Sequence, residues 1–433
     1  MNLSILIIVA IIASIAISYK TKVNMGFLSI AFAYIIGCFC LNIKTSDLIK
    51  MWPLKIFFVV LATSIFYNFA VVNGTLEKMS RNLLYKFRRI PILLPIALFL
   101  VTALIAALGA GYFTSIVLMA PIAYMVGKGT GIDPLIDEIA ANYGSMVGAS
   151  FMISPNGVIY RGLMNSDGYE NMSFVYAAFI FTVSLVLSLL VIIGFIFNTK
   201  RKNKLKGNLE IHKPEPYTSK QKINLILIFL LVLIVLIPPI LHIIAPKNAI
   251  ITIINAKADI GLASIVFSVI ASILKLGDEK QVIAKVPWNT LILVCGVGIL
   301  ISVAIKAGTI KMLASWVSSS MPVFIIPIAV CLIGTFMSFF ASLIGVVIPA
   351  LFPIIPIIAS ASGINPMLLF ACVVIGAQAS TISPFSTGGA VVISYAETEE
   401  ERNAMVNKTL FRALPCCVIA AIIMSAVMTL FFL

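Results

Sequence analysis

Apolar segments of membrane-spanning length alternate with short polar segments along the whole chain. An α-helix needs about 20 predominantly apolar residues to cross the hydrocarbon core of a bilayer, so the pattern predicts an all-α polytopic membrane protein with about 10 spanning helices. We expect these helices near residues 3–18, 25–42, 54–73, 135–165, 173–197, 223–244, 249–275, 288–306, 366–396 and 408–432.

Two further apolar segments, 91–127 and 322–360, are interrupted near their middle by glycine or serine, at 107-ALGAGYFTS-115 and 338-SFFASLIGV-346. Irregular backbone survives at membrane depth only where protein surrounds it or where it lines a wet cavity. We interpret each segment as a re-entrant hairpin and expect the two hairpins to enter from opposite faces.

The chain also contains an internal repeat. A segment that begins at Pro53 aligns without gaps with one that begins at Pro287, and each reaches a Gly-Thr pair after the same interval, at Gly74 and Gly308. Several landmarks in the same order predict a duplication. The register continues from Pro121 and Pro134 to Pro353 and Pro366, and from 154-SPNG-157 to 383-SPFS-386.

Basic residues predict how the two halves are oriented. The densest clusters, 77–89 and 199–222, should be cytoplasmic by the positive-inside rule, which makes the two repeats inverted, as in many secondary transporters. We expect a first repeat over 1–198 (scaffold helices 1–90, hairpin 91–127, broken helix 135–165, helix 173–197), a basic linker over 199–222, and a second repeat over 223–433 (scaffold helices 223–318, hairpin 322–360, broken helix 366–396, helix 408–432).

Composition narrows the class of protein. Of the 433 residues, 61% are hydrophobic and only 11% are charged, where soluble domains carry about 25% charged residues. The net charge of +14 lies mostly in the loops between helices, which favours membrane topology or anionic-lipid contact over nucleic-acid binding. We expect a multi-pass protein of the cell membrane with no nucleic-acid partner.

Several kinds of chemistry find no support in the sequence. The seven cysteines lie in apolar segments without a CxxC pair, and the two histidines, His212 and His242, cannot form a histidine metal site at their spacing. No GxSxG, HExxH or GxxxxGK motif is present, so we expect neither an enzyme nor a nucleotide-driven pump. We expect no cofactor apart from a possible coupling Na⁺.

Four stretches resemble known carriers: 66-FYNFAVVNGTLEKMSRN-82, 108-LGAGYFTSIVLMAPIA-123 with 131-GIDP-134, 142-NYGSMVGASFMISPNGVI-159 and 376-GAQASTISPFSTGG-389. The chain is similar to the ion-transporter superfamily of elevator-type carriers, within it to the divalent anion:sodium symporters, and most closely to MatC-type malonate/dicarboxylate carriers. The resemblance implies a homodimer in the lipid bilayer. In each protomer a transport domain of two hairpins and two broken helices would move against a scaffold domain.

The resemblance also places the hairpin tips at the substrate. Sodium-coupled dicarboxylate members carry Ser-Asn-Thr there, whereas the matching positions are Gly111-Tyr112-Phe113 and Leu343-Ile344-Gly345. This departure does not change the fold that we expect, but it puts the sodium sites and the substrate class in question. The tip residues that we expect to contact substrate are Gly111, Tyr112, Thr114, Ser342 and Gly345.

The two Ser-Pro breaks are the other half of the expected site. A dianion at mid-membrane can be bound by free N–H groups at helix N-termini together with hydroxyl donors, and half-helices are expected after Pro155 and Pro384. The alternative is that the hydroxyls only bond back to helix carbonyls. The predicted substrate ligands are Ser154, Pro155, Asn156, Gly157, Ser383, Pro384, Ser386, Thr387 and Gly388.

Upstream of each break, Gly148, Ser150, Ser380 and Thr381 could offer oxygen atoms to Na⁺. Gly144 and Gly148 fit close helix packing equally well. Arg161 could attract an anion, but we expect it to snorkel to the interface. No clear intramembrane carboxylate is seen beyond Asp137, Glu138 and Asp259, which we expect at helix starts.

The sequence thus predicts a secondary transporter of a small organic anion such as malonate or succinate, coupled to Na⁺ and working by an elevator mechanism. The alternative is a cation/proton antiporter or an inorganic-anion efflux permease on the same scaffold. A third hypothesis is a membrane-embedded enzyme or a passive channel.

Overall fold

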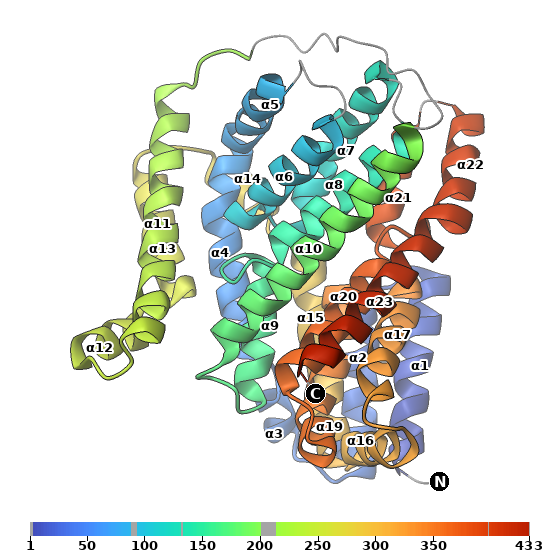
Figure 1. Cartoon of the computed structure of the whole chain (residues 1–433). Helices are drawn as coiled ribbons and strands as arrows, with labels where there is room; N and C mark the ends of the chain where they lie inside the picture. The colour runs from blue at the N-terminus through green and yellow to red at the C-terminus, as the bar shows by residue number, and fades with distance from the viewer. Residues whose placement is uncertain (1–2, 88–92, 131–132, 201–213, 397, 433) are drawn as a thin grey trace.

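The structure is a computed structural model, and it describes residues 3–87, 93–130, 133–200, 214–396 and 398–432. Every regular element in these ranges is helical, and the chain runs repeatedly between an upper and a lower end (Figure 1). Seven of the described helices are long and apolar enough to cross a membrane, or up to eight if a bent pair is one span. The protein is therefore a polytopic, all-helical membrane protein.

The first half holds the α-helices α1 to α10. Their bounds are α1 Leu3–Thr21, α2 Met25–Tyr34, α3 Thr45–Lys50, α4 Leu54–Val72, α5 Thr75–Phe87, α6 Leu94–Ile105, α7 Gly111–Thr130, α8 Pro134–Ala149, α9 Pro155–Ser166 and α10 Ser173–Lys200, with π-helical turns at Ile35–Cys40 (η1) and Ala106–Ala110 (η3).

The second half holds α11 to α23. Their bounds are α11 Ser219–Ile244, α12 Ala249–Lys257, α13 Ile260–Ile273, α14 Glu279–Ala284, α15 Trp288–Lys306, α16 Thr309–Ser320, α17 Ile325–Phe340, α18 Ile348–Leu351, α19 Ile355–Ser362, α20 Pro366–Ala379, α21 Thr387–Ile393, α22 Glu399–Lys408 and α23 Leu414–Phe432; shorter turns lie at Leu343–Val347 (η4), Phe352–Ile354 (η5) and Thr409–Ala413 (η6).

Two of the predicted helices need correction. The span expected over 249–275 is two helices, α12 and α13, which meet at an angle of 64°. Asp259 causes the second to start anew, because its side chain accepts a hydrogen bond from the backbone N–H of Leu262 and caps α13. The helix expected from 408 begins earlier, with α22 at Glu399, and is continuous with α23 through η6.

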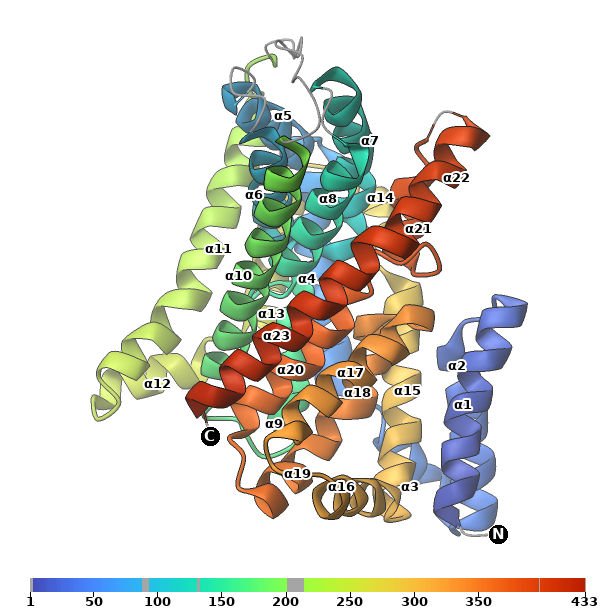
Figure 2. The ribbon, with the colours of Figure 1, turned by 45° about the vertical axis from the view of Figure 1, so that its right-hand side comes forward.

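Both interrupted segments turn back towards the end from which they came. Figure 2 shows α6 and α7 in the upper half of the molecule, whereas α17 and α19 lie in the lower half. In the upper segment, Gly109 and Gly111 have φ values of +98° and +69°, which only glycine adopts readily. A side chain at Gly109 would overlap the Tyr67 ring, so the first turn depends on glycine.

The two halves share local geometry at the aligned positions. Pro53 and Pro287 precede α4 and α15 with nearly equal dihedral angles, φ/ψ of −75°/69° and −76°/64°. Gly74 and Gly308 follow these helices with φ of +72° and +76°. The two helices run in opposite directions, since α4 rises from α3 at the lower end and α15 descends to α16 (Figure 1).

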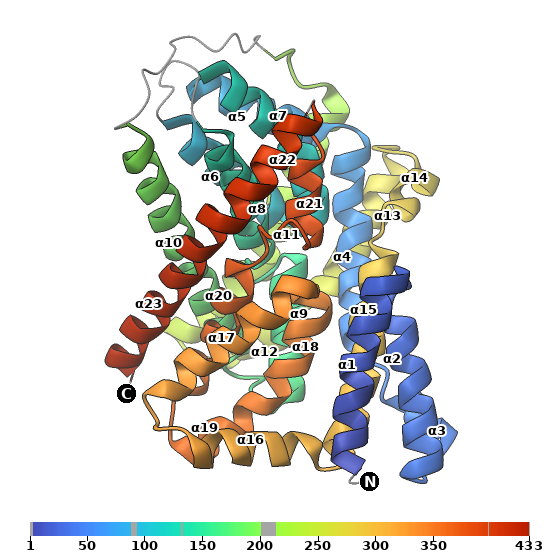
Figure 3. The same cartoon turned by 90° about the vertical axis from the view of Figure 1, so that its right-hand side faces the viewer.

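Three helix pairs approach so closely that a Cβ atom would meet backbone. At Gly148 it would lie 2.0 Å from the Ala103 carbonyl oxygen, and at Gly376 it would lie 2.0 Å from that of Cys331. These contacts join α6 to α8 and α17 to α20. A third pair, α2 and α15, meets at Gly26 and Gly296, and the two helices lie side by side in Figure 3. Small residues allow such contact between membrane helices.

The upper end carries the described part of the basic clusters. The helix α5 holds Lys78, Arg81 and Lys86, and α11 begins beside them with Lys220 and Lys222. Arg88, Arg89 and residues 201–213, on which much of the expected basic charge falls, lie outside the described residues.

Candidate substrate site

The first break separates α8 from α9 at residues 150–154. Ser154 is the N-cap of α9, fully buried, and its hydroxyl donates to the Ala106 carbonyl oxygen in η3 at 2.6 Å. A Cβ atom on Gly111 would lie 3.2 Å from the Pro155 ring. The tip of the first hairpin therefore rests on the first break, as the sequence analysis expects.

Other polar groups of the first break face the protein interior. Asn156 is 4% exposed, and its Nδ2 lies 3.6 Å from the Met146 sulfur. The Ser150 hydroxyl donates to the Met146 carbonyl oxygen at 2.9 Å and lies 3.2 Å from the Tyr160 hydroxyl. Gly157 lies against backbone, because a Cβ atom there would be 2.0 Å from the Phe151 carbonyl oxygen.

The second break separates α20 from α21 at residues 380–386. Its half-helix begins at Thr387, later than expected after Pro384, because Ser386 is the N-cap and accepts a hydrogen bond from the Gly389 N–H at 3.2 Å. Ser383 is fully buried, and its hydroxyl accepts from the Phe385 N–H at 3.2 Å. Pro384 is half-buried; the side chain of Thr387 lies outside what the structure describes.

The second break is held by α8. Asn142 donates from Nδ2 to the Thr381 carbonyl oxygen at 3.1 Å, and the Thr381 hydroxyl lies 3.0 Å from Asn142 Oδ1. The Tyr143 hydroxyl donates to the Ala379 carbonyl oxygen at 3.3 Å. Asn142 is fully buried, so these bonds replace water for the irregular backbone of the break.

Tyr112 brings the first hairpin tip to the second break. Its hydroxyl oxygen and Asn142 Nδ2 lie on the same side of Gly388. A Cβ atom on Gly388 would lie 1.5 Å from the Tyr112 hydroxyl oxygen and 2.8 Å from Asn142 Nδ2. Tyr112 therefore occupies the place that a side chain at position 388 would take. Its neighbour Thr114 is half-buried on α7.

The tip of the second hairpin has different neighbours. Ser342 caps its own turn by accepting from the Gly345 N–H at 3.2 Å, and a Cβ atom on Gly345 would overlap Leu293 of α15. The last turn of α17 does reach the second break, where the Phe339 and Phe385 ring centroids are 5.6 Å apart. The described contacts of Ser342 and Gly345 thus lie with η4 and α15.

The residues expected at Na⁺ already have protein partners. The Ser380 hydroxyl donates to the Thr335 carbonyl oxygen at 2.8 Å, and the Thr381 hydroxyl is also 2.8 Å from the Gln378 carbonyl oxygen. Ser150 bonds within α8, and Gly148 forms the backbone contact with α6. These hydroxyl groups stabilise the ends of α8 and α20.

Sequence reasoning missed several residues that build the site. Asn142, Tyr143 and Thr335 all bond to the second break or its helix. An amide side chain within a segment expected to span the membrane is the signal that could have found Asn142, since such a side chain must find an internal partner. Thr335 carries no such signal, because threonine commonly bonds to its own helix.

Residues 1–149 match the family model described as "Dicarboxylate carrier protein MatC N-terminus". This third of the chain is MatC-like. The resemblance to MatC-type carriers is thereby confirmed over that region. No curated protein matches the chain in sequence.

Two solved transporters share the fold. The YdaH transporter of Alcanivorax borkumensis is 14% identical, with a TM-score of 0.60 over 89% of this chain and 87% of its own. MtrF of Neisseria gonorrhoeae, described among antimetabolite efflux pumps, is 14% identical, with a TM-score of 0.59 over 91% of this chain and 83% of its own. The carrier family and the transporter fold together indicate a membrane transporter and not an enzyme.

Proposed function

We propose that the protein is a secondary carrier of a small dicarboxylate, of the size of malonate or succinate, coupled to Na⁺. The observation that carries this proposal is the pair of interrupted helices that are joined by Asn142 and Thr381, with the Tyr112 hydroxyl packed against Gly388. Irregular, hydroxyl-rich backbone buried in a membrane protein is the usual setting of a transported ligand. The match of residues 1–149 to a dicarboxylate carrier family supports the substrate class.

The transport cycle would be an elevator movement of two inverted repeats. The matched geometry at Pro53 and Pro287 and the opposite directions of α4 and α15 support the inversion. The hairpins and broken helices would move together as a transport domain in each protomer of a homodimer. The upper end, with α5, would face the cytoplasm, because cytoplasmic segments carry the excess of lysine and arginine.

The test is uptake of labelled malonate and succinate into proteoliposomes, with and without an inward Na⁺ gradient. Thr381→Val removes the hydroxyl that meets Asn142, and should lower uptake at least tenfold if the second break holds substrate. Thr182→Val is the matched control, since the Thr182 hydroxyl bonds only to the Ala178 carbonyl of its own helix. Equal uptake by the two variants would remove the second break from the site.

Buried carboxyl groups favour proton coupling as a second candidate. Asp137 is 1% exposed, and within the part of the chain that the structure describes neither of its carboxyl oxygens has a hydrogen-bond partner. Glu138, equally buried, accepts at one oxygen from the Thr409 hydroxyl at 3.1 Å. A carboxyl group without donors is costly to bury unless a proton or a metal ion neutralises it. Uptake driven by a pH gradient and lost in Asp137→Asn would replace Na⁺ by H⁺ in the proposal.

A further inference from the structure

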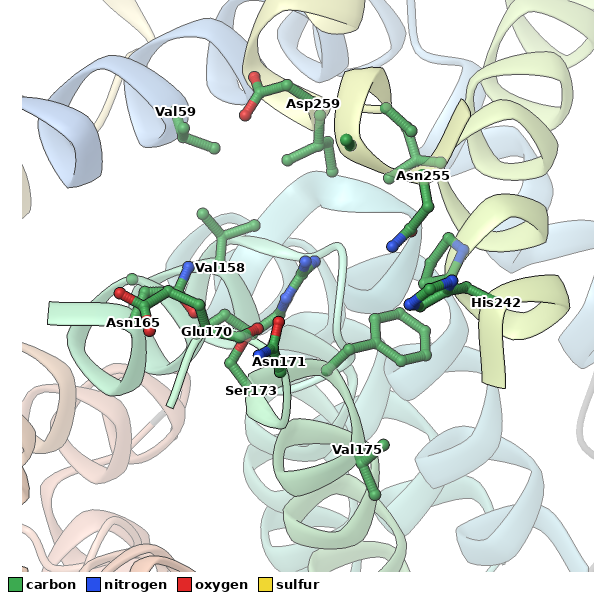
Figure 4. A pocket seen from close by; sticks show the side chains of 18 of the residues that line it. Val59, Val158, Asn165, Glu170, Asn171, Ser173, Val175, His242, Asn255 and Asp259 are labelled. Atoms are coloured by element: carbon green, nitrogen blue, oxygen red, sulfur yellow. The ribbon is translucent and has the colours of Figure 1, made fainter. Parts of the chain in front are cut away.

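A second polar site lies in the lower half of the molecule, beside the first break. It is a cavity of about 350 Å³ between α9 and α10 on one side and α4, α11, α12 and α13 on the other. Figure 4 shows Asn165 and Glu170 on one wall and His242 and Asn255 on the opposite wall, with Asp259 at the rim. Helices of both proposed domains therefore contribute side chains to one cavity.

Arg161 provides the cavity with a cation that is already oriented. Its guanidinium carbon lies 5.3 Å from the centroid of the Phe174 ring, and Nη1 donates to the Met152 carbonyl oxygen at 3.4 Å. The buried Nε has no hydrogen-bond partner among the described residues. Nε and Nη2 form the edge of a guanidinium that binds a carboxylate through two parallel bonds. The expected snorkelling is therefore not what Arg161 does, because its side chain is held against protein.

Two more buried atoms of the cavity lack partners. These are Oδ1 of Asn165 and Nδ1 of His242, which come from α9 and α11. Buried polar atoms are nearly always hydrogen-bonded, and a cluster of exceptions calls for a ligand or water. Together with the free edge of Arg161 they offer donors and acceptors at several points around one small molecule.

The two acidic residues that line the cavity, Glu170 and Asp259, form no ion pair with Arg161 among the described contacts. Asp259 lies within electrostatic range, but its carboxylate caps α13 by accepting from the Leu262 N–H at 2.9 Å, and no ion pair with Arg161 is described. Glu170 is exposed, as is the basic Lys55 on the other side. The interior of the cavity is therefore cationic at Arg161.

We infer that this cavity binds a small carboxylate anion and delivers it to the first break. Met152, whose carbonyl oxygen accepts from Arg161, lies in that break, so a carboxylate at Arg161 would be next to the proposed substrate site. The helices α9 and α12, which line the cavity, lie in the lower half of the molecule, whereas the basic helix α5 lies at the upper end (Figure 1). This inference rests on the proposed function for the identity of the anion, which would be captured on the external side.

The binding test is calorimetric titration of the detergent-purified full chain with succinate. Arg161→Lys keeps the charge but loses the paired edge, and should weaken one binding event at least tenfold. Asn255→Leu narrows the cavity without touching Arg161 or the break and should do the same. Lys257→Ala is the matched control, since this exposed lysine follows Asn255 but does not line the cavity. Monodisperse elution of each variant shows that it has folded.

Transport separates this inference from the proposed function. In proteoliposomes, Arg161→Lys should raise the KM for external succinate about tenfold and leave kcat largely unchanged, which a role confined to holding Met152 would not produce. If succinate binding depends on Arg161 but no succinate is taken up, the inferred binding site stands and the proposed carrier function is wrong. If succinate binding is unchanged in both Arg161→Lys and Asn255→Leu, the inferred binding site is wrong, whether or not the protein takes up succinate.

Discussion

At the scale of single residues, close contacts surround Gly388 at the second break. The Tyr112 hydroxyl fills the place of a side chain at Gly388, and Asn142 Nδ2 lies on the same side. The hydroxyls singled out in the sequence are mostly bonded to backbone carbonyls, so they stabilise the breaks whether or not they also meet substrate. Glycine at position 388 is therefore as important as the serines around it.

We expect Gly388→Ala to destabilise the protein by about 1–3 kcal/mol, since the added methyl group must displace Tyr112, and to abolish uptake. Thermal unfolding in detergent measures the first effect and proteoliposome uptake the second. Gly194→Ala is the control, because a Cβ atom there meets no atom within 4 Å. If both alanine variants unfold at the same temperature as the wild type, the Tyr112 hydroxyl does not lie where a side chain at position 388 would lie.

Asp167, in the turn between α9 and α10, should make stability depend on pH. Burial raises the pKa of its carboxyl to about 7, against about 4 in an unfolded chain. Between these values the folded state holds more protons than the unfolded state, so stability falls as pH rises through this window and stays low above it.

Asp167→Asn removes the ionisable carboxyl and with it this pH-dependent contribution to the free energy of unfolding. The substitution should stabilise the protein more at pH 8 than at pH 5, by about 2 kcal/mol. Denaturation at the two pH values measures it, with Glu400→Gln as an exposed control. A stability gain that is equal at both pH values would show that burial does not shift this group.

At the scale of elements, the positions at which helices start after a proline were the most predictable feature. The expected starts after Pro53, Pro155 and Pro287 are within a residue of the structure, because proline cannot continue a preceding helix and fits a first turn. Asp259 does stand at a helix start, as expected, but the single span predicted over 249–275 was wrong, because the apolar residues on both sides of Asp259 favour one continuous helix. Hydrophobicity alone does not show where a helix changes direction.

The N-termini of α8 and α20 correspond in the two halves but differ in charge. Asp133 caps α8 and pairs with Lys408 at 3.0 Å and Arg412 at 2.8 Å, which fixes α8 to the α22–α23 helix. Asn365 caps α20 by accepting from the Met367 N–H at 2.9 Å. The first cap therefore does more than end a helix.

Asp133→Asn should keep the cap and lose the ion pairs, at a cost of about 1 kcal/mol, while Asp133→Ala loses both and costs about 2 kcal/mol. Asn365→Ala, which loses a cap only, should cost about 1 kcal/mol. Thermal unfolding of the three variants gives the order. Equal melting of the two Asp133 variants would mean that the cap contributes nothing.

At the scale of the whole molecule, the sequence predicted the order of the helices but not which side chains join the hairpin tips and the breaks. Apolar length and glycine positions determine where a chain crosses or turns back, and these can be read locally. The bonds between Asn142 and Thr381 join residues far apart in sequence, and no local pattern marks their partners.

Orientation can be tested at the two ends of the molecule. Cys40 is exposed and precedes α3 at the lower end, and Lys220 is exposed at the upper end. In whole cells a membrane-impermeant maleimide should label a variant that keeps only Cys40, and should label Lys220→Cys in a cysteine-free background only after permeabilisation. The reverse pattern would place the basic end outside.

The backbone contacts at Gly148 and Gly376 have a consequence for how a gate could open. They press the first arm of each hairpin, α6 and α17, against the intact half of a broken helix, α8 and α20. Where a glycine meets backbone, no side chain can change rotamer to absorb a displacement, so those arms cannot slide there without breaking close packing. The two hairpins differ in their second arms, since α7 also packs along α8, whereas the segment from η4 to α19 contacts α20 far less than α17 does. If the lower hairpin acts as a gate, the part that moves is therefore η4 to α19, while α17 stays fixed to α20.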